Sequence, residues 1–250
     1  MDGPCIRPAG AVRLTTGTGG GLGSCGRHRL RAPRGGRQVP PPEGAAVISS
    51  ENVRAYVERM ASDEPAPGGG AAGALQAALG AALIAMSARY STASEHADRA
   101  RRAADRAEEL IPRALGLADA DAEAFGALSA AYTLPKDTAE EKAERSRAVQ
   151  EATAGAARPP RELIGVGTEV VGLARELTGW CNPNVLSDVA AASEAARAAV
   201  ATAMVTLEIN VRALKDAATR EELRAGLAEG ERAVEDAAEL TRLIRERVRG

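Results

Sequence analysis

Residues 64–90 read EPAPGGGAAGALQAALGAALIAMSARY and contain both kinds of segment that shape this chain. The opening Pro-x-Pro-Gly-Gly-Gly cannot continue a helix, because proline and glycine both disfavour helical backbone. After it, large apolar side chains recur at helical spacing with alanine or glycine on most other faces, at Leu75, Leu79, Leu83, Met86 and Tyr90. A helix that is apolar nearly all round is typical of the middle of a bundle. Its alanine and glycine content and its polar flanks argue against a membrane span.

The rest of the chain from Ser49 onward also shows helical periodicity, and no segment shows the period-two alternation of a strand. We therefore predict an all-α fold, a bundle of long alanine-rich helices. Ser49 or Ser50 is expected to cap the first helix, and Pro112 is expected to kink or break the third. The remaining helices are expected at 53–60, 94–132, 138–157 (ended by Pro159-Pro160), 161–178, 185–215 and from about 220 to the end.

Composition limits the functions that are open to the chain. Its 250 residues suffice for a large buried core, 45% are hydrophobic and only 2% are aromatic. A net charge of −2 gives no bulk reason to expect nucleic acid or a polybasic membrane anchor as a partner. Two His and three Cys, with no pair at zinc-ligand spacing, limit metal chemistry. We expect no metal and no membrane or nucleic-acid partner.

The first fifty residues differ from the remainder. They hold seven Arg and two acidic residues, a net of 7 − 2 = +5, with eleven of the 26 Gly and six of the 13 Pro. We interpret residues 1–49 as a disordered tail, with Val47 as an alternative start, and residues 50–250 as one helical domain. Cys5 and Cys25 fall in the tail, which leaves Cys181 alone in the core. No disulfide framework follows, and the cytoplasm is the simplest compartment.

The first unusual motif is the glycine run Gly68-Gly69-Gly70 ahead of the apolar helix. Three glycines can expose backbone N–H groups at a helix N-terminus, which favours an anion. The alternative is a flexible turn or a close helix crossing. The run lacks the Lys-Ser/Thr and the preceding strand of a phosphate-binding P-loop.

The second motif is Asn182-Pro183-Asn184-x-x-Ser187-Asp188, where two amides and a carboxylate fall close together. They could converge on a polar heterocycle. The alternative is an elaborate helix start in which Asn184 is the cap and Asp188 lies near the positive end of the helix dipole.

The third motif is Asn210, within Glu208–Arg212 late in an otherwise apolar helix. The alternative interpretation is an exposed polar patch. Asp188 and Asn210 are 22 residues apart, about 33 Å along a straight helix at roughly 1.5 Å per residue. They cannot serve one small ligand within one subunit unless the helix breaks. An antiparallel helix of a second subunit would bring them together.

Taken in order, these motifs resemble the cyclodeaminase/cyclohydrolase family of folate enzymes. The resemblance covers roughly residues 51–250 and also includes Asp119-Ala-Asp121-Ala-Glu-Ala-Phe125, Leu134-Pro135-Lys136 and a charged helix with Arg145 and Gln150. Two positions depart from the family pattern: Ala71, where serine is usual, and Trp180-Cys181, where smaller residues are common.

The resemblance implies an all-α homodimer that acts on tetrahydrofolate one-carbon derivatives. Cyclodeamination closes 5-formiminotetrahydrofolate to 5,10-methenyltetrahydrofolate with release of ammonia, and cyclohydrolysis opens the methenyl ring with water to 10-formyltetrahydrofolate. Such a site needs an anion near the cationic carbon and a group that shuttles a proton. It needs neither a metal, nor a histidine, nor a cofactor besides the folate substrate.

The resemblance also suggests roles for individual residues. Asp188 is the first candidate, for cation stabilisation, proton transfer or binding of the pterin amino group, and Asp121 is the second carboxylate. Asn182 and Asn184 would hold pterin edges, and Asn210 is structural or touches a distant part of a long ligand. Lys136 and Arg212 would reach the glutamate tail, and Gly68, Gly69 and Gly70 would let the backbone approach the ligand. The competing classes are a non-catalytic helical assembly protein and a folate-binding relative without activity.

Overall fold

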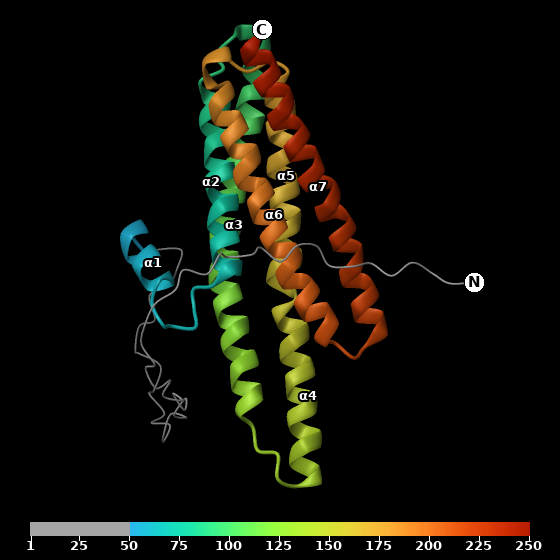
Figure 1. The fold of residues 1–250 in the computed structure, drawn as a ribbon. Helices are drawn as coiled ribbons and strands as arrows, with labels where there is room; N and C mark the ends of the chain where they lie inside the picture. Colours follow the sequence, from blue (N-terminus) through green and yellow to red (C-terminus); the bar gives the residue numbers. More distant parts are fainter. Residues whose placement is uncertain (1–50) are drawn as a thin grey trace, which may run out of the picture. The chain divides into compact units, whose positions relative to one another are not determined.

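A computed structural model describes residues 51–250, so the predicted tail at 1–49 lies outside the described residues. All regular structure in the described part is helical, which confirms the all-α prediction (Figure 1). The long elements are α1 (Val53–Met60), α2 (Gly69–Arg89), α3 (Ala97–Thr133), α4 (Ala139–Ala156), α5 (Arg158–Thr178), α6 (Leu186–Ala213) and α7 (Ala217–Arg249). Two short 3-10 turns, η2 (Ser94–His96) and η3 (Pro183–Val185), precede α3 and α6.

Helix α2 is the centre of the bundle, as its sequence predicts. It packs against α3, α5 and α6, and most of its alanines are buried together with Ile84. Small residues permit this close packing: a Cβ on Gly80 would lie 3.1 Å from the Ala192 carbonyl oxygen and 3.2 Å from Val170. Within residues 51–250, α2 is also the one helix that is long and apolar enough to cross a membrane, judged by length and composition only. Because 61% of that apolar window is buried inside the protein, a core role accounts for the same composition.

The two proline predictions had different outcomes. Pro112 does not break the third helix, since α3 runs without interruption through it. Leu110, Ala114 and Leu117 are buried on either side, and this packing offsets the hydrogen bond that the proline ring removes. Pro159 and Pro160 lie in the first turn of α5, where their missing N–H groups cost little, and so they separate α4 from α5 as expected.

Two predicted caps were wrong. Asn52, and not Ser49 or Ser50, caps α1 by accepting a hydrogen bond from the Ala55 N–H. Asn184 does not cap α6, because the residue before that helix is Val185 and makes no side-chain cap. Asn182 instead caps the preceding turn η3, where its side chain accepts from the Asn184 N–H. Both motifs contain adjacent residues that can serve as caps, so the choice depends on backbone geometry that the sequence does not reveal.

Candidate active site

A cavity of about 240 Å³ lies at the N-terminal end of α2. It is bounded by the loop before α2 and by residues of α3, α4 and α6. Three of the predicted groups meet here, namely the glycines Gly68–Gly70, the carboxylate of Asp121 and the amide of Asn210. These groups come from three segments that are far apart in the sequence. Because α2 and α6 run antiparallel, the start of α2 lies near the end of α6 (Figure 1).

The contact between Gly70 and Asp121 defines this cavity. A Cβ added to Gly70 would overlap the Asp121 carboxylate, so only glycine leaves room for it. The backbone N–H of Ala71 donates a hydrogen bond to the same carboxylate. The carboxylate of Asp121 thus lies at the positive end of the α2 dipole, where the glycine run was expected to favour an anion.

Burial raises the pKa of the Asp121 carboxyl above its ordinary value, and the hydrogen bond from Ala71 offsets only part of that rise. Asp121 is half-buried on α3 and lines the cavity. A carboxyl group with a raised pKa in a cavity takes up and returns a proton nearer to neutral pH than a solvated one. This is the property that a proton-shuttling group needs.

Asn210 closes the cavity on the α6 side. Asn210 is only 8% exposed, so it is not part of an exposed polar patch, although Glu208 and Arg212 on either side of it are exposed. Its Nδ2 donates a hydrogen bond to the Ala156 carbonyl oxygen at 2.9 Å and so ties the end of α4 to α6. Thr206, one turn earlier on α6, lines the same cavity. The sequence could have indicated Thr206, because a residue four positions before Asn210 lies on the same face of the helix.

The second predicted group lies at the opposite end of α2 and α6. Asn182 binds the end of α2, because its Nδ2 donates to the Tyr90 carbonyl oxygen at 3.2 Å and its backbone N–H donates to Ser91 Oγ at 2.9 Å. Asn184 is exposed and Asp188 is half-buried in the first turn of α6. The structure does not bring these three residues to the Asp121 cavity within one chain. A separate cavity of about 320 Å³ beside them is lined by His96, Trp180 and Asn182, among others.

The other residues of the resemblance lie outside the Asp121 cavity. Lys136 is exposed in the turn between α3 and α4, and Arg212 is exposed on α6. Gln150 stabilises the turn between α6 and α7. Its side-chain amide donates a hydrogen bond to the Ala213 carbonyl and accepts one from the Lys215 N–H. Arg145 donates to the Tyr132 carbonyl and holds the hairpin of α3 and α4. These contacts are structural.

No three His, Cys, Asp or Glu side chains are grouped to hold a metal ion within residues 51–250. Phe125 lines the Asp121 cavity but was not assigned a role from the sequence. It lies one turn after Asp121 on α3 and adds an apolar ring to a wall of small residues. The cavity thus offers one carboxylate, amide and hydroxyl groups and one aromatic face, which suits a flat polar heterocycle.

Comparison with known proteins bears on this arrangement. Residues 52–229 match the family model described as formiminotransferase-cyclodeaminase. This region is most of the chain and includes both groups of candidate residues. The chain belongs to the formiminotransferase-cyclodeaminase family. The resemblance inferred from the motifs is confirmed, and the Asp121 cavity lies within the matched region of this family member.

Individual relatives show how much of a protein the chain represents. It is 34% identical over 181 residues to methenyltetrahydrofolate cyclohydrolase of Methylorubrum extorquens, covering 70% of this chain and 86% of that protein. It is 33% identical over 196 residues to rat formimidoyltransferase-cyclodeaminase, covering 74% of this chain and 35% of that protein. The chain thus spans about a third of the length of the rat relative.

A solved structure supports the fold. The crystal structure of formiminotetrahydrofolate cyclodeaminase from Thermotoga maritima superposes with a TM-score of 0.72 at 24% identity, covering 81% of this chain and all of that one. At this identity the likeness shows a shared fold alone.

Proposed function

We propose that this chain is a folate one-carbon enzyme that interconverts tetrahydrofolate derivatives through 5,10-methenyltetrahydrofolate, with its reaction centre in the Asp121 cavity. The observation that carries the proposal is the Asp121 carboxyl itself, held against Gly70 and the Ala71 N–H with its pKa raised by burial. The names of the M. extorquens and rat relatives point to the same pair of reactions.

In the cyclohydrolase direction, water attacks the cationic carbon between N5 and N10 of the substrate. Asp121 accepts a proton from that water as the new C–O bond forms, and its negative charge offsets the positive charge of the carbon. The C–N5 bond then breaks, and Asp121 returns the proton to N5. The product is 10-formyltetrahydrofolate, and one proton is released to solvent overall.

In the cyclodeaminase direction, N10 attacks the formimino carbon on N5, and Asp121 accepts the N10 proton. The formimino group enters as the protonated amidine, so its nitrogen becomes the amino group of the tetrahedral intermediate. Asp121 returns the N10 proton to this amino group, which leaves as ammonia and gives the methenyl cation. Of the two reactions we place cyclohydrolysis first, because the chain aligns with 86% of the cyclohydrolase and 35% of the rat protein. Because Cys181 is a free buried thiol, we place the reaction in a reducing compartment, the cytoplasm.

We also propose that the site is completed by a second copy of the chain. Helices α2 and α6 both pack on α5, and their outward faces carry exposed large apolar side chains, including Leu79 at 54% and Ile209 at 64% exposure. An apolar helix face of this kind is covered in a stable assembly. A two-fold axis across it reverses the direction of α6 and brings the Asp188 end of one copy to the Asp121 cavity of the other. Asp188, with Asn184 beside it, would then bind the pterin.

Mixing two inactive variants tests this shared site. Asp121→Asn and Asp188→Asn each damage both sites of a homodimer, but a mixed dimer carries both changes at one site and neither at the other. After random exchange of subunits we expect an equal mixture to regain about a quarter of the wild-type activity, while each variant alone stays low. A mixture no more active than its components, with subunit exchange verified, would exclude the shared site.

The function itself is tested by absorbance in two parallel cuvettes. One holds the protein with 5,10-methenyltetrahydrofolate, and the other holds it with 5-formiminotetrahydrofolate. Loss of the methenyl absorbance above the spontaneous rate shows a cyclohydrolase, and its gain in the second cuvette shows a cyclodeaminase. Silence in both cuvettes from folded protein contradicts an enzymatic role. In that case folate binding without turnover would favour a binding protein, and no binding would favour a helical assembly protein.

A further inference from the structure

Helix α1 carries a buried group that the proposed reaction does not yet use. Tyr56 is the buried residue of this helix, at 5% exposure, while Val53 and Val57 on the same helix are exposed. The Tyr56 hydroxyl is fully buried and has no hydrogen-bond partner among the described residues. An unpaired buried hydroxyl is costly and calls for an explanation.

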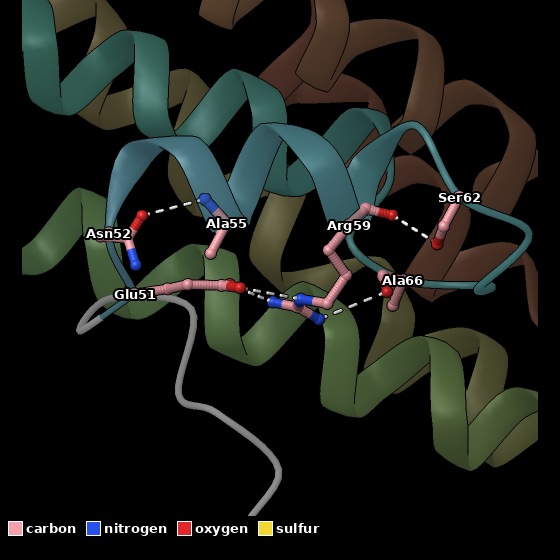
Figure 2. A network of polar contacts seen from close by, with 6 residues as sticks. All are labelled: Glu51, Asn52, Ala55, Arg59, Ser62 and Ala66. Carbon is pink, nitrogen blue, oxygen red and sulfur yellow. Dashed lines mark hydrogen bonds and ion pairs between the residues drawn. The ribbon is translucent and has the colours of Figure 1, made fainter.

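The surroundings of Tyr56 connect α1 to the Asp121 cavity. Figure 2 shows the Arg59 guanidinium between the Glu51 carboxylate and the carbonyl of Ala66, with donor–acceptor distances of 2.6 and 3.2 Å to Glu51 and 3.4 Å to Ala66. Ala66 belongs to the loop that lines the cavity. This network links the helix that carries Tyr56 to the loop at the cavity wall.

Burial raises the pKa of the Tyr56 hydroxyl above its ordinary value. The charge of Arg59 lowers this pKa, and the charges of Glu51 and of Asp121 on α3 raise it. Both oxygens of Glu51 already accept hydrogen bonds from Arg59. Arg59 can only donate. Of the four acceptor positions of the Asp121 carboxylate, one accepts a hydrogen bond from the Ala71 N–H, whereas Arg59 uses two of the four on Glu51. Asp121 is therefore the acceptor best suited to the unpaired hydroxyl.

We propose that Tyr56 is a positioning residue, whose hydroxyl donates a hydrogen bond to the Asp121 carboxylate once substrate fills the cavity. Substrate displaces water from Asp121, so the ionised carboxylate then needs a donor from the protein. Helix α1 packs only sparsely on the other described helices, so a small shift of Tyr56 toward Asp121 disturbs little else. The bond would hold Asp121 ionised and oriented in the complex.

The test is Tyr56→Phe, which keeps the ring and removes only the hydroxyl. It rests on the proposed function, and its readout is the pH dependence of two kinetic constants. The profile of kcat/KM reports the free enzyme and that of kcat reports the complex. We expect the acidic limb of kcat to move up by about one pH unit, because the carboxylate loses a hydrogen bond to its charged form. We also expect the plateau of kcat to fall about tenfold, because the carboxylate is less well oriented. The acidic limb of kcat/KM should stay in place.

Stability distinguishes positioning from packing. Because the hydroxyl is unpaired in the free protein, Tyr56→Phe should leave the melting temperature unchanged or raise it. Tyr132→Phe, at an exposed tyrosine on α3, is the matched control and should change neither profile. Identical kcat profiles for Tyr56→Phe and wild type, or equal shifts in both constants, would overturn the inference while the function stands. A wild-type protein inactive on both folates would overturn the function and this inference with it.

Discussion

Replacing Asp121 by Asn should lower kcat by at least about 100-fold with either folate substrate, the usual scale for removal of a proton-transferring group. Asn has nearly the same shape and can still accept the hydrogen bond from Ala71, so the cavity keeps its form but loses its proton carrier. Substrate affinity should change much less than kcat, since the effect is on the transition state. Glu123→Gln, an exposed change of the same kind on α3, is the control and should retain full activity. An Asp121→Asn variant with undiminished kcat would remove Asp121 from the mechanism.

The raised pKa of Asp121 gives this variant a second signature. The active form is the carboxylate, so wild-type activity should fall with acid in a limb that lies above the ordinary aspartate pKa of 3.8. In the native state the ionised form is disfavoured by burial, so it costs stability at pH values above the raised pKa. Asp121→Asn should therefore melt at an equal or higher temperature near neutral pH. This advantage should shrink as the pH falls through the raised pKa and vanish below 3.8. Thermal melts at several pH values measure it.

Gly70→Ala should lower kcat by about 100-fold for a different reason. The new methyl group would occupy the position of the Asp121 carboxylate, which must rotate away and lose its hydrogen bond from Ala71. A displacement of about 1 Å in a reacting group costs on the order of 100-fold in rate. Kinetics of the purified variant measure this loss.

Stability again separates the explanations for Gly70→Ala. Alanine favours helix over glycine by about 1 kcal/mol, so the variant should remain folded at the start of α2. Gly126→Ala on α3 is the matched control, since a Cβ there meets nothing within 4 Å. It should keep full activity with unchanged or higher stability. Full activity in Gly70→Ala as well would mean that the contact with Asp121 does not matter for catalysis.

The sequence was sufficient for the fold but not for all of its details. An apolar pattern on every face of residues 71–90 predicts a central helix, and packing on three neighbours confirms it. Pro112 shows the limit of local rules, because buried contacts along α3 outweigh the propensity of one residue. The choice of Asn182 as the cap depends on the hydrogen bonds that join it to Tyr90 and Ser91, residues about ninety positions earlier.

The candidate site was harder to predict. Helix length alone showed that Asp188 and Asn210 lie at opposite ends of α6, and the structure agrees. That Gly70 and Asp121 are in contact follows from how α2 and α3 pack, and no pattern within either segment indicates it. Tyr56 matched only the spacing of a helix face, so its buried hydroxyl without a hydrogen-bond partner could be found only in three dimensions. The roles of Asp188, Asn184 and Lys136 remain predictions.

The central claim is that folate binds where Asp121 meets the start of α2. A crystal structure of the protein with 5-formyltetrahydrofolate, a chemically stable compound with the same pterin and glutamate, tests it most directly. We predict the pterin in the cavity beside Gly68–Gly70, with the one-carbon unit within about 3 Å of the Asp121 carboxylate. A ligand bound elsewhere, with no contact to Asp121 or Gly70, would contradict the account.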